Sequence, residues 1–265
     1  MSVNLLGRLA LVTGSTTGIG LGIAHSLASK GCSVILTGII DQTLVSGLLS
    51  EFTRDDYKGR VHFFPSDFLE IENVETFCQD VLALYPDGID ILVNNAGVPG
   101  RGLIENVSTK LWQDTISVNL NAPFVLTRAF FPLMKKRGWG RIINMSSQMG
   151  QVGEVGKLAY CTTKSALIGF SRVVALEGAQ FGVTCNAICP GFVDAPMCHS
   201  IIEKQAMEKG ITFEESKVDF LKERCPNRRL IPVSDITELI SFLCSDAGSS
   251  MTGSPILVDG AYTAR

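Results

Sequence analysis

The sequence predicts an α/β fold, with one parallel sheet of about seven strands doubly wound by helices on both faces. Short runs rich in Val, Ile and Leu alternate along the chain with longer helical patterns. Several of the short runs are apolar on both sides, as in strands that are covered on both faces. The expected strands are residues 9–13, 34–37, 61–64, 89–94, 141–145, 183–189 and 256–258.

A single domain over residues 1–265 is expected, because the spacing of these segments is even and no linker or internal repeat interrupts it. Of the 265 residues, 46% are hydrophobic, which is ample for a core. A net charge of -3 and a pI near 5.7 provide no basic surface for nucleic acid or an anionic membrane. Small-molecule partners are therefore favoured.

The cysteines and the N-terminal run indicate a cytoplasmic protein without a metal. No apolar run reaches the roughly 18 residues of a membrane span, and the run that contains Arg8 predicts a first strand, not a signal peptide. The eight cysteines have no Cys-x-x-Cys spacing, which favours free thiols in a reducing compartment. His25, His62 and His199 stand near no cysteine pair, so a zinc site is not expected.

A glycine-rich turn follows the first expected strand. Gly14, Gly18 and Gly20 precede a helical stretch at 21–29, and glycines there let the backbone approach a pyrophosphate at the helix N-terminus. Three residues separate the first two glycines, which differs from the usual dinucleotide fingerprint and leaves a simple glycine turn as an alternative. The strand–turn–helix position favours a Rossmann-type dinucleotide site.

Tyr160 and Lys164 are four residues apart, which places both on one face of a helix. An ammonium beside a phenol favours the phenolate and lowers its pKa toward the range of a general acid or base. The same spacing is common in solvated pairs, so it carries weight only in company. Ser147 ends an expected strand thirteen positions upstream, and residues 94–97 close another strand on the same edge.

Residues 190–230 interrupt the alternation with a charged, helical excursion. Within it Thr212 and Glu215 have the spacing of a capping box. The excursion leaves from the carboxyl end of a strand, where ligands bind in doubly wound sheets. We expect it to be a substrate lid.

With these motifs the chain resembles the short-chain dehydrogenase/reductase family over essentially its whole length. The resemblance implies an oxidoreductase that interconverts a secondary alcohol and a ketone. It implies that Tyr160 gives or takes the proton, that Ser147 rather than Ser146 orients the carbonyl oxygen, and that Lys164 holds the nicotinamide ribose. Asn119 would support a proton-relay water. The implied cofactor-binding residues are Gly14, Thr17, Gly18, Ile19, Gly20, Gly38, Asp67, Asn95, Ala96, Gly97, Tyr160, Lys164, Pro190, Gly191 and Val193.

The cofactor is expected to be NAD, with NADP the alternative. Residues 37–41 at the end of the second strand include no Arg or Lys for a 2′-phosphate, and Thr17 is also uncharged. The position where NAD-preferring relatives carry an acidic residue is Gly38. Asp41 lies further on, either as a partner for the ribose or as a turn residue.

Within the family, residues 13–24 and 186–191, the length of the lid and the ending at 262–265 make the chain most similar to the D-3-hydroxybutyrate dehydrogenases. Those enzymes hold the substrate carboxylate with Gln, His, Lys and Gln at positions that match Pro99, Met149, Lys157 and Ile201 here. Only the lysine is kept, which predicts poor binding of a small carboxylate and a more apolar substrate. The substrate would therefore lie among Ser147, Met149, Lys157, Tyr160, Pro99 and Ile201.

Three alternatives stay open. Arg101, Gln148 or Arg224 could supply the missing carboxylate contacts, which would make the chain a true D-3-hydroxybutyrate dehydrogenase with a different clamp. The fold could also serve a dinucleotide-binding scaffold without turnover. The family resemblance further implies a homotetramer that uses the helices at 124–134 and 165–177 and the C-terminal segment.

Overall fold

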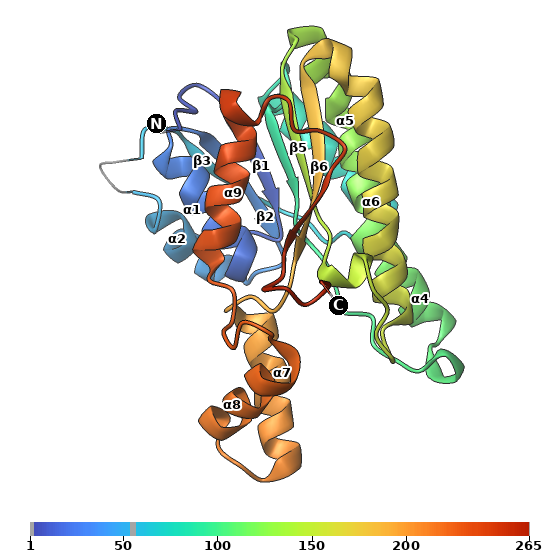
Figure 1. The fold of residues 1–265 in the computed structure, drawn as a ribbon. Coiled ribbons are helices and arrows are strands. Elements are labelled where there is room, and N and C mark those ends of the chain that lie inside the picture. Colours follow the sequence, from blue (N-terminus) through green and yellow to red (C-terminus); the bar gives the residue numbers. More distant parts are fainter. Residues whose placement is uncertain (1–2, 54–56, 265) are drawn as a thin grey trace.

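The computed structural model describes residues 3–53 and 57–264. Seven parallel strands form one sheet in the order β3-β2-β1-β4-β5-β6-β7 (Figure 1). They are β1 Leu9–Thr13, β2 Ser33–Gly38, β3 Val61–Pro65, β4 Ile91–Asn94, β5 Gly140–Met145, β6 Val183–Pro190 and β7 Pro255–Val258. The predicted strands are confirmed, except that β4 begins two residues later than expected, after Asp90.

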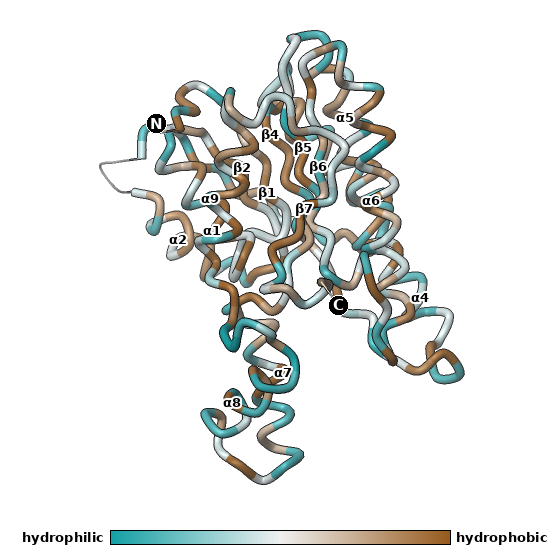
Figure 2. The backbone as a smooth tube through the Cα atoms, in the orientation of Figure 1, coloured by the Kyte–Doolittle hydropathy of each residue, from teal (hydrophilic) through white to brown (hydrophobic). Residues whose placement is uncertain are grey.

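The sheet is buried on both faces because its strands alternate residues between two hydrophobic clusters. In β1, Ala10 and Val12 pack in one cluster while Leu9 and Leu11 pack in the other. Helices α1 and α9 cover the first face, and α3, α5 and α6 cover the second (Figure 1). Figure 2 shows the resulting hydrophobic strands at the centre of the molecule. The doubly wound arrangement expected from the sequence is present.

The helices account for most of the remaining chain. No helix in the described ranges is both long enough and apolar enough to cross a membrane. The α-helices are α1 Gly18–Ser29, α2 Gln42–Ser50, α3 Ile71–Leu84, α4 Thr109–Ile116, α5 Ala122–Arg137, α6 Leu158–Gly178, α7 Pro196–Lys209, α8 Phe213–Arg224 and α9 Val233–Cys244. Shorter turns are η1 Ile104–Asn106, η2 Ser117–Asn121, η3 Gln148–Gly150, η4 Ala179–Phe181 and η5 Asp246–Gly248.

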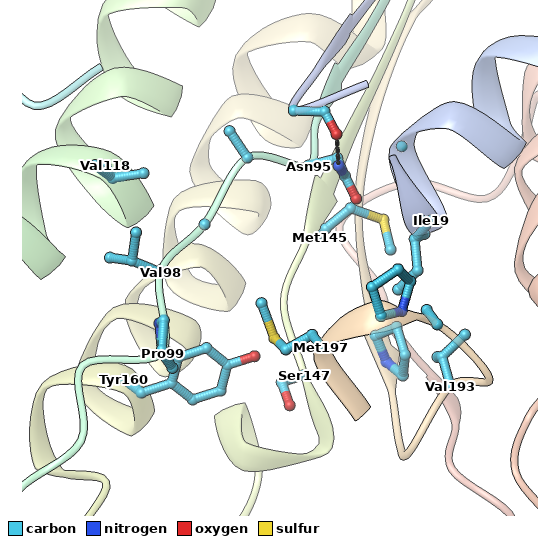
Figure 3. A pocket seen from close by; sticks show the side chains of 18 of the residues that line it. Ile19, Asn95, Val98, Pro99, Val118, Met145, Ser147, Tyr160, Val193 and Met197 are labelled. Carbon is cyan, nitrogen blue, oxygen red and sulfur yellow. Dashed lines mark hydrogen bonds between the residues drawn. The ribbon is translucent and has the colours of Figure 1, made fainter. Parts of the chain in front are cut away.

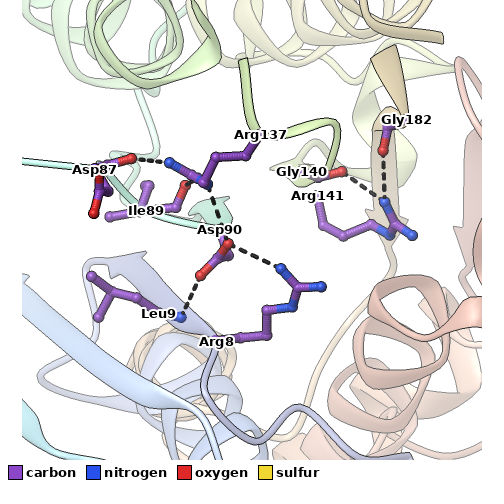
Figure 4. Close-up of polar contacts among 9 residues, drawn as sticks. All are labelled: Arg8, Leu9, Asp87, Ile89, Asp90, Arg137, Gly140, Arg141 and Gly182. Atoms are coloured by element: carbon purple, nitrogen blue, oxygen red, sulfur yellow. Dashed lines mark hydrogen bonds and ion pairs between the residues drawn. The ribbon is translucent and has the colours of Figure 1, made fainter. Parts of the chain in front are cut away.

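An ionic network joins the strands at the amino edge of the sheet (Figure 4). Asp90 accepts a hydrogen bond from the Leu9 N–H at 2.9 Å and one from the Arg8 guanidinium at 3.3 Å. The Arg137 guanidinium, at the end of α5, lies 3.6 Å from the same carboxylate. Asp90 therefore ties β1, β4 and α5 together at the end where each strand begins.

The segment between β6 and α9 projects from the rest of the molecule as the pair α7 and α8 (Figure 1). Its two ends are tied together, because Ile231 N–H donates to the Phe192 carbonyl and Asp194 N–H donates to the Ile231 carbonyl. The predicted capping box is present at the start of α8, where Thr212 and Glu215 bond reciprocally. A small core of its own, including Ile202 and Phe220, holds the pair together.

Candidate active site

A cavity of about 520 Å³ opens at the carboxyl edge of the sheet, between the strand ends and α7 (Figure 3). It is lined by every predicted cofactor and substrate residue and by all the predicted catalytic residues except Asn119. The lining residues are spread over a stretch of nearly two hundred positions, from Gly14 to Ile201, and the fold brings them together around one cavity. The carboxyl edge is where doubly wound sheets bind ligands.

The turn after β1 requires its glycines. Gly14 has φ +60°, and a Cβ there would lie 2.9 Å from the Ala96 Cα. A Cβ on Gly20 would lie 2.2 Å from the Gly14 carbonyl oxygen, so the first turn of α1 packs directly on the loop. No side chain caps the N-terminus of α1 at Thr17, which leaves its first N–H groups for another acceptor. The loop forms a cradle that fits a pyrophosphate.

The side chains of Thr13 and Asn95 fix the ends of β1 and β4 against each other. The Thr13 hydroxyl accepts hydrogen bonds from the Asn95 and Ala96 N–H groups, both at 2.9 Å. The Asn95 side-chain amide donates to the carbonyls of Thr13 at 2.9 Å and Gly14 at 3.1 Å. The Asn95 side chain thus fixes the glycine turn through hydrogen bonds within the protein.

At the end of β2 the cavity wall is formed by Gly38 and Ile39, whose side chain is 75% exposed. Asp41 does not line the cavity. Its carboxylate accepts from the Thr43 N–H at 2.8 Å and caps α2, and the hydrogen bonds from Thr43 hold the pKa of Asp41 below its usual value. Of the two roles considered for Asp41, a partner for the ribose or a turn residue, the structure supports the turn residue.

The hydroxyls of Ser147 and Tyr160 lie near each other on the wall at the other end of the cavity (Figure 3). Ser147 ends the run after β5 and accepts from the Met149 N–H at 3.1 Å, which fixes its position. Ser146 points elsewhere, because its hydroxyl donates to the Lys164 carbonyl at 2.7 Å. Of the two serines, Ser147 is therefore the one whose hydroxyl lies near that of Tyr160.

Lys164 lies buried beneath Tyr160. Its ammonium donates to the Met145 carbonyl at 2.7 Å and stands 5.5 Å from the centre of the Tyr160 ring. Burial lowers the pKa of Lys164 to about 8. The expectation that this ammonium lowers the pKa of Tyr160 was wrong for the structure: burial raises the pKa of Tyr160, and the opposing effects come from Ser147 and Arg101.

Asn119 lies behind the cavity wall, not on it. It is fully buried in η2, a π-helical turn between α4 and α5. Its side chain accepts from the Val98 N–H at 2.8 Å and donates to the Val98 carbonyl at 3.0 Å and to the Thr163 hydroxyl at 3.2 Å. Asn119 therefore fixes the wall segment at Val98 and the helix α6, which carries Tyr160 and Lys164. Such π-helical turns interrupt the helical hydrogen bonds and are frequent at functional sites.

The end of the cavity beyond Tyr160 is mainly apolar. Figure 3 shows Val98, Pro99 and Met197 near the two hydroxyls, and Met149, Phe192 and Ile201 complete the lining. Met149 is 2% exposed, so it is part of the wall. Three side chains that the sequence expects in the substrate pocket are thus apolar and border the same space.

Lys157 also borders this space, but it is not a lone charge. Its ammonium lies 2.7 Å from Glu154, at angles that are poor for a hydrogen bond. The other Glu154 oxygen accepts from Arg224, at the end of α8, at 2.8 Å. Sequence reasoning missed Glu154, although its spacing of three residues from Lys157 was a signal for an ion pair.

The other two groups considered for a carboxylate clamp differ in position. Gln148 is 2% exposed, and its side-chain oxygen has no hydrogen-bond partner in the described chain. Arg101 is exposed at the cavity rim. The cations that line the cavity, within residues 3–53 and 57–264, are Arg101, Lys157 and Lys164. In the same ranges no three His, Cys, Asp or Glu side chains are grouped for a metal ion.

Comparison with known proteins places this site in a family. A family model described as short chain dehydrogenase matches residues 8–206. The D-beta-hydroxybutyrate dehydrogenase of Cupriavidus necator is 38% identical over 261 residues, covering 98% of this chain and 100% of that protein. The chain belongs to the short-chain dehydrogenase family. The D-beta-hydroxybutyrate dehydrogenase of Rhizobium meliloti is also similar to this chain. It is 37% identical, and the match covers 97% of this chain and 99% of that protein.

Among solved structures, that of L-sorbose reductase from Gluconobacter frateurii, complexed with NADPH and L-sorbose, superimposes with a TM-score of 0.92. It is 27% identical and the match covers 99% of this short-chain dehydrogenase and 98% of the reductase. The protein is therefore a Rossmann-type oxidoreductase similar to D-3-hydroxybutyrate dehydrogenase. Its substrate and its choice between the two nicotinamide cofactors rest on the site itself.

Proposed function

We propose that this short-chain dehydrogenase uses NAD to interconvert a neutral, largely apolar ketone and its secondary alcohol. The observation that carries the proposal is that the neighbouring Ser147 and Tyr160 hydroxyls line a cavity whose substrate end is mainly apolar. A hydroxyl pair of this kind can bind and protonate a ketone oxygen. The apolar walls favour a substrate without charge.

The glycine cradle would hold the dinucleotide. The uncapped N-terminus of α1 and the close packing of Gly14 and Gly20 fit a pyrophosphate, and Asp67 borders the part of the cavity where an adenine would lie. Gly97, Pro190, Gly191 and Val193 border the part nearer Tyr160. The cofactor supplies the hydride acceptor or donor.

The chain's own residues would move the proton. In reduction Tyr160 donates its phenolic proton to the ketone oxygen while Ser147 donates a hydrogen bond to the same oxygen. In oxidation Tyr160 takes the proton back. Lys164 would hold the nicotinamide ribose with its buried ammonium. Asn119 positions this set by fixing α6 through Thr163, and would support the proton-relay water.

NAD rather than NADP is proposed because the ribose end of the cavity offers nothing basic. Thr16, Thr17, Gly38 and Ile39 surround it, and none of these side chains carries a positive charge to pair with a 2′-phosphate. The NADPH complex of L-sorbose reductase concerns a relative, and the lining of this chain supports the other cofactor. The test is the ratio of kcat/KM for NAD and NADP with one substrate. A ratio in favour of NADP would contradict the proposal.

D-3-hydroxybutyrate should be a poor substrate, because positions 99, 149 and 201 carry apolar side chains where the D-3-hydroxybutyrate dehydrogenases carry polar ones. Charge-assisted hydrogen bonds contribute about 1.5 to 3 kcal/mol each, so the loss of two lowers kcat/KM by roughly a thousandfold. A substrate panel that includes D-3-hydroxybutyrate and uncharged secondary alcohols tests this by following reduced nicotinamide absorbance. A kcat/KM for D-3-hydroxybutyrate above about 10⁴ M⁻¹s⁻¹, lost in Arg101→Gln, would instead identify the true dehydrogenase with Arg101 as its clamp.

The same panel separates an enzyme from a dinucleotide-binding scaffold. A scaffold would quench or enhance cofactor fluorescence on binding without turning over any ketone. The pair of hydroxyls on the cavity wall favours the enzyme, because a binding protein has no need of a phenol beside a second hydroxyl there.

For the whole chain we propose one domain over residues 1–265, in which 190–230 act as the substrate lid. The support for the lid is that Met197, Cys198 and Ile201 of α7 border the cavity. We further propose a cytoplasmic homotetramer. Exposed apolar side chains on α5 and α6, such as Phe124, Val173 and Leu176, support these helices as contact surfaces. Light scattering that gives the 28.6 kDa of one chain would contradict the tetramer.

A further inference from the structure

The charge that Lys157 presents to the cavity is balanced by a carboxylate that belongs to none of the predicted motifs. Glu154 lies between η3 and α6 and touches two cations, Lys157 at 2.7 Å and Arg224 at 2.8 Å. Lys157 borders the cavity, whereas Glu154 and Arg224 lie just outside it. The Glu154 carboxylate thus contacts Lys157 from outside the cavity.

Glu154 is charged in this arrangement. Its side chain is 21% exposed and that of Lys157 is 13% exposed, so solvent screens the pair weakly. Burial opposes ionisation of Glu154, but the contacts with Lys157 and Arg224 hold its pKa below its usual value. Lys157 therefore faces the cavity with its positive charge already balanced.

We propose that Glu154 is a specificity-determining residue that excludes carboxylate substrates by occupying Lys157. The inference rests on the proposed function and names a cause for its preference for neutral substrates. A carboxylate that entered beside Tyr160 would have to separate Lys157 from Glu154, or accept a second negative charge close to its own. An uncharged ketone meets neither obstacle.

The pair of Glu154 and Lys157 disfavours the binding of a carboxylate by itself. This effect adds to the absence of polar side chains at positions 99, 149 and 201. Lys157 is the single carboxylate-binding group kept at those matched positions, and Glu154 removes it from use. Removing the Glu154 charge alone should therefore restore part of the attraction for a carboxylate, without any change to the apolar walls.

The test compares two reductions that differ in substrate charge, those of acetoacetate and of its methyl ester. In the wild-type protein the ester should have the higher kcat/KM. Glu154→Gln keeps the size of the side chain and should raise the ratio of acetoacetate to ester by about tenfold, the value of one freed charge-assisted contact. Adding Lys157→Met should abolish the gain.

Arg224→Gln is the matched control, because it removes the other contact of Glu154 and leaves Lys157 occupied. It should leave the ratio unchanged. An equal gain in Arg224→Gln would assign the effect to the tie between α8 and the η3–α6 loop, and would overturn the inference. Thermal unfolding checks each variant, and Glu154→Ser repeats the charge removal should Glu154→Gln fail to fold.

The failures of the inference and of the proposed function are distinguishable. An unchanged ratio in folded Glu154→Gln, with ester reduction retained, overturns the inference and leaves the proposed function standing. A wild-type protein that reduces acetoacetate and not the ester overturns both.

Discussion

The two edges of the sheet treat charge in opposite ways. At the amino edge Asp90 meets two guanidinium groups and a backbone N–H, so its charge is balanced and its oxygens are bonded (Figure 4). At the carboxyl edge Lys164 is buried against a carbonyl, and the Gln148 side-chain oxygen has no hydrogen-bond partner in the described chain. The first edge is built for stability. At the carboxyl edge, buried polar groups lack part of the hydrogen bonding and solvation that water would give them, and a bound ligand can supply it.

The largest expected effect separates chemistry from stability at the carboxyl edge. Tyr160→Phe removes one hydroxyl and should lower kcat by about 10² to 10⁴-fold, while affinity for the dinucleotide stays nearly the same. Stopped-flow turnover and cofactor titration measure the two quantities. Activity within tenfold of the wild type would remove Tyr160 from the proton-transfer role.

The amino edge should behave in the reverse manner. Asp90→Ala leaves Arg8 and Arg137 without their shared carboxylate and removes the acceptor of the Leu9 N–H. The free energy of unfolding should fall by about 3 kcal/mol, because partly buried partners lose their counter-charge. Urea denaturation measures the loss. KM for substrate should not change, and a change in KM would show that the two edges are coupled.

A pH experiment sharpens the contrast at Lys164. Its pKa is about 8 in the folded protein, below the ordinary lysine value of 10.5, so the unfolded chain binds more protons between these values. Stability contributed by this group therefore rises with pH across that window. Relative to Lys164→Met, the wild-type protein should gain about 2 kcal/mol from pH 7 to pH 9.5.

Urea denaturation of both proteins at the two pH values measures this gain, and the comparison cancels the titration of other groups. No change in the difference would mean that the buried ammonium keeps its ordinary pKa. Asp90→Ala serves as the control, because its stability difference from the wild type involves no group that titrates in this window.

The smallest expected effect concerns an ion pair outside both edges. Arg128 and Glu75 are 2.6 Å apart on α5 and α3, but their side chains are 55% and 46% exposed. Glu75→Gln should lower the free energy of unfolding by no more than about 0.5 kcal/mol, because water and salt screen the pair. A loss equal to that of Asp90→Ala would show that burial does not explain the difference between the pairs.

The sequence by itself determined the fold and predicted the candidate reacting groups. Runs of Val, Ile and Leu specify strands that are buried on both faces, so their number and boundaries could be predicted within about two residues. The glycines before α1 and the spacing of Tyr160 and Lys164 are local signals, because a turn and a helix each fix the relation of neighbours along the chain.

Only the tertiary structure decided how these groups are charged and which of them reach the cavity. Asn119 carries a family signal, yet it lies behind the wall, and Asp41 belongs to a helix cap. The pKa of Tyr160 is governed by burial, which no spacing reports. Glu154, beside Lys157, also binds Arg224, seventy residues away in the chain, a contact that only the folded structure shows because electrostatic energy depends on distance and burial in space.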